Sequence, residues 1–224
     1  MKLLFFITKP YSVPILSPIE SYCSSIDQIE VAWFKAGSAK SLDLEGKVIE
    51  TTADVIEFDP DAVIVPGNVV PDFWPGIKVQ IFHGLCEEKK GHYDITGFFD
   101  LYCTPGPQMT EKFMELGEQY NTFLVRETGW PKLDLLFPIP NVEELKITLG
   151  LNPDKKFILY APTFSPKYTS ADDLFGSIQE SQFLEHEWVV KFHDLEKNAT
   201  IERYRTLNSD LFKIIENKDI LPWM

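Results

Sequence analysis

Short apolar runs alternate along the chain with longer segments whose apolar residues recur at helical spacing. The runs end at Pro, Gly or Asp, and several are rich in β-branched or aromatic residues, as strands are. This alternation is typical of β-α-β units and predicts an α/β fold with a parallel sheet. The strands predicted in the first part of the chain are residues 3–7, 29–34, 62–65, 79–82, 101–104 and 123–126.

Between the last two of these strands, the sequence predicts a helix from Pro107 to Leu116. Proline suits the first turn of a helix, because the backbone donor that it lacks has no partner there. Met109, Phe113 and Leu116 follow at spacings that place them on one side of the helix. The expected buried face of this helix is therefore defined by three side chains.

A proline-rich segment, Leu136-Phe-Pro-Ile-Pro-Asn, interrupts the pattern. Two prolines in three positions remove backbone donors that a continuing helix or a central strand needs. We therefore place a domain boundary here, with a Rossmann-like domain in residues 1–138 and a second one beginning at residue 139. Asn141 is expected to cap a helix that runs to about Gly150, in a capping box with Glu144. The later strands are predicted at 157–161, 188–192 and 211–215, with helices at 171–182 and 201–207.

Residues 139–224 hold only about three predicted strands. Domains of this class usually contain ~100 to 150 residues, so we expect only the first part of a second Rossmann-like domain here. A sheet that lacks strands exposes an unpaired edge and apolar surface, which favours self-association. The sequence therefore predicts that the 224-residue chain is catalytically inactive by itself and self-associates.

Charge and cysteine content narrow the classes of function. The chain has 21 Lys and Arg against 34 Asp and Glu, a net charge of −13, which disfavours binding of a nucleic-acid backbone. Its three cysteines are odd in number and widely spaced, so neither a disulfide framework nor a metal site is predicted. No apolar stretch approaches the ~20 residues of a membrane span. We expect a cytoplasmic protein, with peripheral contact to the inner face of the membrane left open.

The segment Gln80-Ile-Phe-His-Gly places His83 at the end of an apolar strand. Open α/β sheets bind ligands at the carboxyl ends of their strands. Imidazole titrates near neutral pH and can accept a proton from an attacking hydroxyl, and Gly84 would let a substrate approach closely. A histidine that only satisfies a strand-end carbonyl explains the same residues equally well, so both interpretations stay open.

Further polar residues follow other predicted strands. Lys89 and Lys90 can hold a diphosphate or can form part of a solvated loop. Thr104 and Gly106 precede a helix, where anions bind, although a plain turn accounts for them too. The segment around Trp130 is expected to pack that indole across the domain junction. Polar residues beside it, which we consider as lining an acceptor site, are Lys132 and Asp134.

In the second region, His193 also ends an apolar strand. The loop after the preceding strand carries Thr163, Ser165 and Lys167, whose side chains can bond a phosphate or a sugar hydroxyl. Strand-end histidines in two successive Rossmann-like units are expected to face each other across a cleft. This expectation makes His83 and His193 the candidate catalytic pair.

Four ordered blocks resemble the CDP-glycerol glycerophosphotransferase family. They are Gln80-Ile-Phe-His-Gly, Thr128-Gly-Trp-Pro-Lys-Leu-Asp, Tyr160-Ala-Pro-Thr-Phe and Lys191-Phe-His, and the resemblance spans roughly residues 60 to 224. The family often continues with Thr-Pro-Leu-Lys where this chain has Leu85-Cys-Glu-Glu, and often has Pro where this chain has Asp194. These departures leave the identity of the polyol and of the acceptor open.

The resemblance implies a GT-B-like fold and a defined activity. Its members bind the acceptor mainly with the first domain and the CDP-alcohol with the second. They transfer glycerol phosphate, or a related polyol phosphate, to a cell-envelope polymer or its lipid-linked primer, release CMP and require no cofactor. By the same resemblance, His83 corresponds to the base and His193 to a histidine that contacts the donor phosphates.

Two other classes of function fit the same two-domain pattern. A GT-B glycosyltransferase or a sugar-nucleotide epimerase would use a UDP-sugar and act at a sugar carbon. A non-catalytic relative would bind a nucleotide or a partner without turnover. Trials with CDP-glycerol, CDP-ribitol and UDP-sugars separate these alternatives.

Overall fold

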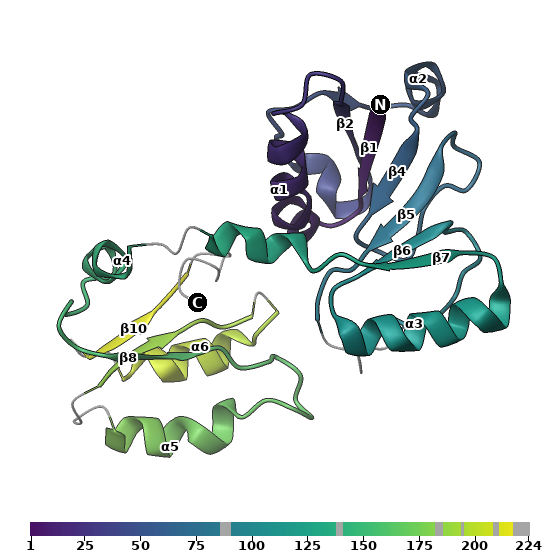
Figure 1. The fold of residues 1–224 in the computed structure, drawn as a ribbon. Helices are drawn as coiled ribbons and strands as arrows, with labels where there is room; N and C mark the ends of the chain where they lie inside the picture. The colour runs from purple at the N-terminus through teal and green to yellow at the C-terminus, as the bar shows by residue number, and fades with distance from the viewer. Residues whose placement is uncertain (86–90, 138–140, 182–185, 194, 208–210, 217–224) are drawn as a thin grey trace. The chain divides into compact units, whose positions relative to one another are not determined.

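Two parallel sheets, one in each unit of the chain, carry the fold (Figure 1). The computed structural model describes residues 1–85, 91–137, 141–181, 186–193, 195–207 and 211–216. The chain divides into one unit from Met1 to Leu135 and another from Leu136 to Met224. Pro138 and Pro140, on which the predicted boundary rests, lie outside the described residues.

The sheet of the first unit has seven described strands in the order β3-β2-β1-β4-β5-β6-β7, and all neighbours pair in parallel. The chain builds outward from β1 through β2 and β3, and then crosses back to place β4 on the other side of β1. The crevice between β1 and β4 is therefore the topological switch point, where open α/β sheets bind ligands. The strands are β1 Lys2–Ile7, β2 Glu30–Lys35, β3 Val48–Ile49, β4 Ala62–Val65, β5 Ile77–Ile81, β6 Leu101–Thr104 and β7 Leu124–Glu127.

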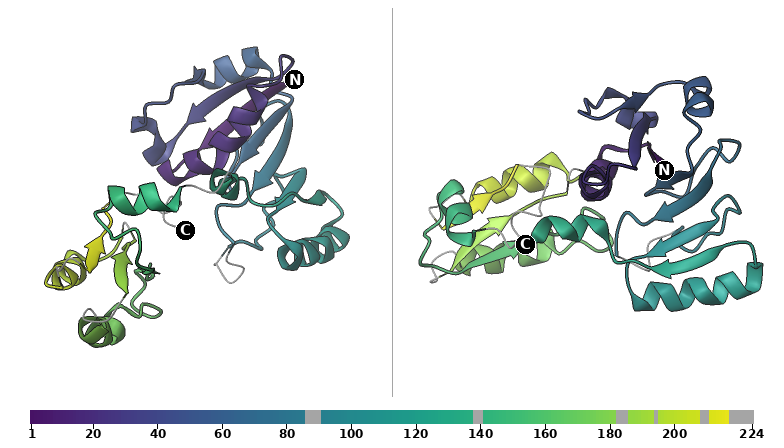
Figure 2. Two further views of the ribbon diagram at one scale, coloured as in Figure 1. Left: turned by 60° about the vertical axis from the view of Figure 1, so that its left-hand side comes forward. Right: turned by 45° about the horizontal axis from the view of Figure 1, so that its top comes forward.

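Helices cover both faces of this sheet, an arrangement that can be followed in Figure 2. Leu4 and Phe6 of β1 pack into the core under α2 (Thr52–Phe58) and α3 (Pro107–Tyr120). The alternate residues of β1 pack into the opposite core, which contains residues of α1 (Val13–Cys23) and the 3-10 helix η2 (Gly37–Ser41). Burial on both faces explains why β1 is an unbroken apolar run. Two more 3-10 helices are η1 (Pro10–Ser12) and η3 (Pro131–Leu136).

Local capping signals account for the helix ends in the first unit. Thr51 and Asp54 form a reciprocal capping box at the start of α2. Helix α3 runs four residues past the predicted end at Leu116 and stops at Asn121, whose φ of 53° lies in the left-handed region that asparagine tolerates. The ends of these helices are therefore set by single capping residues, and the spacing of apolar residues locates them less well.

The second unit contains a three-stranded parallel sheet in the order β10-β9-β8 among its described residues. Residues of α5 and α6 pack into one core on this sheet, and residues of α4 pack into the other. The predicted strands and helices of this region are all present, with ends shifted by a few residues. The elements are α4 Val142–Thr148, β8 Phe157–Tyr160, α5 Ala171–Ser181, β9 Glu187–Val190, α6 Asn198–Arg205 and β10 Phe212–Ile214.

Asn141 begins helix α4, as the sequence predicts. Its side-chain oxygen accepts hydrogen bonds from the backbone N–H groups of Glu143 and Glu144. The predicted capping box is wrong, since among the described residues no bond returns from the Glu144 carboxylate to the N–H of Asn141. Asn141 alone therefore caps the helix.

We predict that Phe113→Ala destabilises the first unit by about 3 to 5 kcal/mol, because it leaves a cavity where a fully buried ring stood. The matched control is the neighbouring Met114→Ala, since Met114 is 57% exposed and its loss should change stability by about 0.5 kcal/mol or less. Urea unfolding of both variants measures the difference. Equal stability of the two variants would contradict the burial of Phe113 in the core of the first unit.

Candidate functional site

His83 lies two residues beyond the end of β5, and its ring is oriented by a backbone carbonyl. Its Nδ1 is 3.2 Å from the carbonyl oxygen of Pro66, in the loop after β4. A carbonyl oxygen can only accept a hydrogen bond, so Nδ1 is the donor and carries the hydrogen. In the neutral ring the basic lone pair is then on Nε2.

Aromatic rings hold His83 on two sides. The Tyr11 ring lies 5.6 Å away between centroids and is tilted by 32°. The buried ring of His92 meets His83 edge-on at 5.0 Å. These contacts restrict the rotation of the imidazole around its position at the strand end.

Trp130 fixes the backbone immediately before His83. Its indole Nε1 donates a 2.7 Å hydrogen bond to the carbonyl of Phe82. The indole also packs against the core that contains β1 and α1. These contacts hold Trp130 within the first unit, and its packing across the domain junction stays a prediction.

A small cavity opens beside His83 at the switch point of the first sheet. Its volume is about 120 Å³. Its polar lining comes mainly from the loops that follow β1 and β4, together with His83 after β5. The lining residues are Phe6, Thr8, Lys9, Tyr11, Ser12, Val65, Pro66, Gly67, Asn68, Val69 and His83.

Three of the other residues predicted near this site lie at the ends of β5 and β6. Gly84 is half-buried next to His83, and a Cβ placed there would meet no atom within 4 Å. Thr104 is fully buried, and its hydroxyl is engaged with the Thr110 hydroxyl and the Arg126 carbonyl. Gly106 is the N-cap of α3 in extended backbone that any residue adopts. These bonds give Thr104 a structural role at the start of α3.

The remaining predicted residues of the first unit are charged. Lys132 places its ammonium 5.8 Å from the ring centre of Trp130, whereas Asp134 is exposed. Lys89 and Lys90 lie outside the described residues. Lys132 therefore contacts Trp130, and Trp130 in turn is hydrogen-bonded to Phe82, the residue before His83.

His193 follows β9, and its ring is oriented by the opposite kind of contact. The backbone N–H of Leu195 donates a 3.1 Å hydrogen bond to its Nδ1. Nδ1 is therefore the acceptor, and in the neutral ring the hydrogen is on Nε2. His83 and His193 consequently present different groups at Nε2, a proton acceptor in the first and a donor in the second.

The structure brings the predicted phosphate-binding loop of the second unit to His193. Phe164 lies between Thr163 and Ser165 in the loop after β8, and its ring centre is 4.4 Å from that of His193. Thr163 and Lys167 are exposed and Ser165 is half-buried. The residues on either side of Phe164 in the sequence therefore carry hydroxyl groups.

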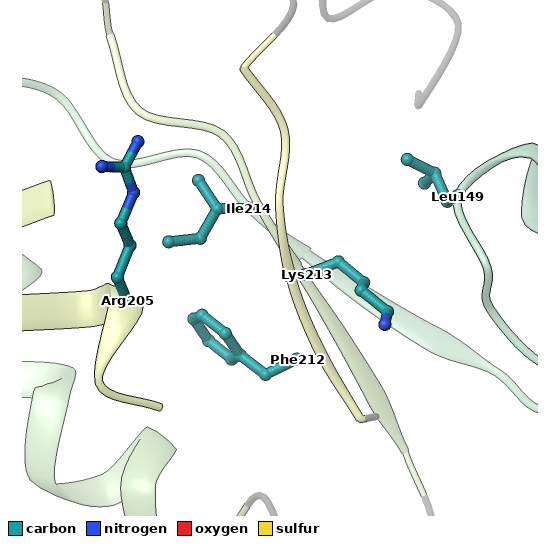
Figure 3. Close-up of a pocket in the computed structure, with 5 residues that line it drawn as sticks. All are labelled: Leu149, Arg205, Phe212, Lys213 and Ile214. Atoms are coloured by element: carbon teal, nitrogen blue, oxygen red, sulfur yellow. The ribbon is translucent and has the colours of Figure 1, made fainter. Parts of the chain in front are cut away.

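A second cavity, of about 350 Å³, lies along β10 in the second unit (Figure 3). Arg205 on its wall is already paired with Glu202 and Glu216. Lys213 and Leu149 line the cavity from the other side of β10 in this view. The cavity contains none of the predicted site residues. Its full lining is Leu149, Arg205, Phe212, Lys213 and Ile214.

The two described cysteines are poorly suited to act as nucleophiles. Burial, and then the charge of Glu20, raises the pKa of the Cys23 thiol. Burial also raises the pKa of the Cys103 thiol, an effect that a hydrogen bond from Thr128 partly opposes. Since the thiolate is the reactive form, both thiols are held in the less reactive state at neutral pH.

The described part of the chain contains neither a metal-binding cluster nor a membrane-spanning helix. No group of three or more His, Cys, Asp or Glu side chains is arranged to hold a metal ion there. Among the same residues, no helix is both long enough and apolar enough to cross a membrane.

Solved structures define the class of fold. The S. aureus MnaA structure with UDP matches with a TM-score of 0.68 at 14% identity, covering 99% of this chain and 70% of that one. UDP-GlcNAc 2-epimerase from Neisseria meningitidis matches at 0.65 and 13% identity, covering 100% and 74%. The wall teichoic acid polymerase TagF, soaked with CDPG, matches at 0.55 and 18%, covering 87% and 55%. The chain thus has the predicted α/β, GT-B-like fold, and at these identities the similarity shows the fold alone.

Sequence similarity identifies the family. Residues 85–211, more than half of the chain, match the CDP-Glycerol:Poly(glycerophosphate) glycerophosphotransferase family, and the chain belongs to this family. The teichoic acid poly(glycerol phosphate) polymerase of Bacillus spizizenii is 28% identical over 124 residues, which cover 50% of this chain. The aligned part spans about a third, 31%, of that relative's length. The family assignment made from the four sequence blocks is confirmed.

The sequence alone did not identify the cavity residues that come from the loops after β1 and β4. Lys9, Tyr11 and Asn68 carry no recognisable motif, and they precede the part of the chain that matches the family. The available signal was positional, since each follows a predicted strand of a parallel sheet.

We predict that the neutral rings of His83 and His193 are opposite tautomers. At a pH of about 8.5, where imidazole is ordinarily neutral, hydrogen should be on Nδ1 of His83 and on Nε2 of His193, because their Nδ1 atoms face a carbonyl and an N–H group. Long-range ¹H–¹⁵N NMR spectra measure this, with His83→Gln and His193→Gln used to assign the signals. The same tautomer at both residues would contradict the two hydrogen bonds.

Proposed function

We propose that this chain carries the reacting groups of an enzyme that transfers glycerol phosphate from CDP-glycerol to a hydroxyl group, with release of CMP. The observation that carries the proposal is the pair of orientations at the two strand ends. His83 is set to accept a proton at Nε2, and His193 is set to donate a hydrogen bond from Nε2. Family membership supplies the donor class.

His83 acts in this reaction as the general base. Its Nε2 takes the proton of the acceptor hydroxyl while the hydroxyl oxygen attacks the phosphorus that bears glycerol. The bond between that phosphorus and the bridging oxygen breaks, and the electron pair leaves with CMP. The proton remains on the imidazole until it is passed to solvent. The rings of Tyr11 and His92 hold the imidazole in place during this step.

His193 and its neighbouring loop act on the donor. The Nε2–H group of His193 donates to an oxygen of the diphosphate, where negative charge increases as CMP leaves. Thr163 and Ser165, the sequence neighbours of Phe164 in the loop that contacts His193, supply hydroxyl donors to the same group. Lys167 adds a positive charge in this loop, and Lys89 and Lys90 remain part of the proposal as further phosphate contacts.

The acceptor in this proposal is a polyol-phosphate polymer of the cell envelope or its lipid-linked primer. The relative from Bacillus spizizenii is named a teichoic acid poly(glycerol phosphate) polymerase, which supports an acceptor of this kind. We place the acceptor at the first unit, at the strand ends that carry His83 and Gly84. Lys132 and Asp134 are retained as acceptor-side residues, whereas the buried hydroxyl of Thr104 serves the fold.

We predict that His83→Ala lowers kcat about 100-fold or more, because a general base is lost, while the dissociation constant for CDP-glycerol changes by less than about twofold. CMP release and donor calorimetry are measured in a form of the enzyme that turns over CDP-glycerol. The matched control is His186→Ala, since His186 is an exposed histidine before β9. Unchanged turnover in His83→Ala would reject its assignment as the base.

We predict that His193→Ala weakens CDP-glycerol binding about tenfold, because a hydrogen bond to a charged phosphate is lost. Calorimetry on the 224-residue chain measures this without turnover, with His186→Ala again as the control. CDP-ribitol and UDP-GlcNAc are titrated in parallel to test the donor class. Equal CDP-glycerol affinity in His193→Ala and the parent protein, or tighter binding of UDP-GlcNAc, would count against the proposal.

A further inference from the structure

The cavity beside His83 lies at the ligand-binding position of its sheet. Thr8, Lys9 and Tyr11 come from the loop after β1, and Asn68 comes from the loop after β4. These are the two strands on either side of the switch point. The described residues that line the cavity belong to the first unit.

The size of the cavity restricts its occupant. Pockets for ligands of drug or cofactor size measure ~300 to 1,000 Å³, whereas this one measures about 120 Å³. A nucleoside is too large for it. A three-carbon polyol is of the right size, and its hydroxyl groups match the polar atoms of the lining.

The charge of the lining is opposite to that of the whole protein. The chain has a net charge of −13, yet none of the described residues that line this cavity carries a carboxylate. Lys9 is the lysine among the lining residues, and in the described part of the chain no carboxylate forms an ion pair with it. A positive charge that is not already paired within the described residues is available to an anionic ligand.

The polar groups around Lys9 are held in place by the fold. Asn68 donates from its side-chain amide to the carbonyl of Gly91 at 2.9 Å, which fixes the amide plane. The phenol of Tyr11 is protonated at neutral pH and can donate a hydrogen bond. The lining thus offers a fixed amide, further hydroxyl groups and one cation.

We propose that this cavity binds the terminal polyol phosphate of the acceptor, with its hydroxyl groups among Thr8, Tyr11, Asn68 and His83 and its phosphate on Lys9. The inference rests on the proposed function and names the residues that recognise the acceptor. It assigns Lys9 as a specificity residue, which distinguishes a phosphate-bearing polyol from an uncharged one.

The test uses glycerol 3-phosphate as the probe and the 224-residue chain as the protein. Binding is followed by NMR through the side-chain signals of His83. We expect saturable binding of glycerol 3-phosphate, with glycerol and inorganic phosphate each at least about tenfold weaker, because each lacks half of the contacts. Absence of saturable binding, or inorganic phosphate binding as tightly as glycerol 3-phosphate, would overturn the proposal.

Variants at Lys9 test the phosphate contact. Lys9→Met should weaken glycerol 3-phosphate binding about tenfold and leave glycerol binding unchanged, whereas Lys9→Arg should retain most of the affinity. The matched control is Lys112→Met, since Lys112 is an exposed lysine of α3 outside the cavity. Equal losses in Lys9→Met and Lys112→Met would reject the assignment of Lys9.

The two proposals fail in distinguishable ways. If CMP release depends on His83 but glycerol 3-phosphate does not bind the cavity, only the assignment of the acceptor site is wrong. If glycerol 3-phosphate binds with the expected dependence on Lys9 but CDP-glycerol is neither bound nor turned over, the assignment of the cavity as a polyol-phosphate site is retained. The proposed donor is then wrong.

Discussion

The parallel pairing of β1 with both β2 and β4 is the constraint on which the first unit depends. β1 is buried on both faces, and its residues alternate between two cores. Because β2 and β4 flank it on opposite sides, the loops that follow β1 and β4 diverge and leave the crevice at the switch point. The central position of β1 in the sheet thus determines where the cavity beside His83 forms.

A backbone group contacts Nδ1 of each of the two histidines. Pro66 offers a carbonyl to His83, and Leu195 offers an N–H group to His193. Such contacts select the tautomer of each neutral ring. A parallel strand followed by a loop therefore presents a proton acceptor at Nε2 of His83 and a hydrogen-bond donor at Nε2 of His193.

Fold and family contribute different parts of the functional argument. The structures of S. aureus MnaA with UDP and of the Neisseria meningitidis UDP-GlcNAc 2-epimerase have higher TM-scores than the teichoic acid polymerase structure. All three are below 25% identity to this chain and show the fold alone. The match over residues 85–211 identifies the glycerophosphotransferase family. Function in such a widely used fold depends on the residues at its strand ends.

The sequence alone determined the alternation of strands and helices, the family and the position of His83 and His193 at strand ends, because these follow from local patterns. It did not predict α1, whose internal Pro18 hides its helical pattern, or the short helix α2. Only the tertiary structure decided that Pro66, 17 residues away, orients His83, and that Lys9 and Tyr11 share its cavity. The physical reason is that parallel crossovers bring the carboxyl ends of distant strands to one edge of the sheet, while packing around each ring sets its rotation.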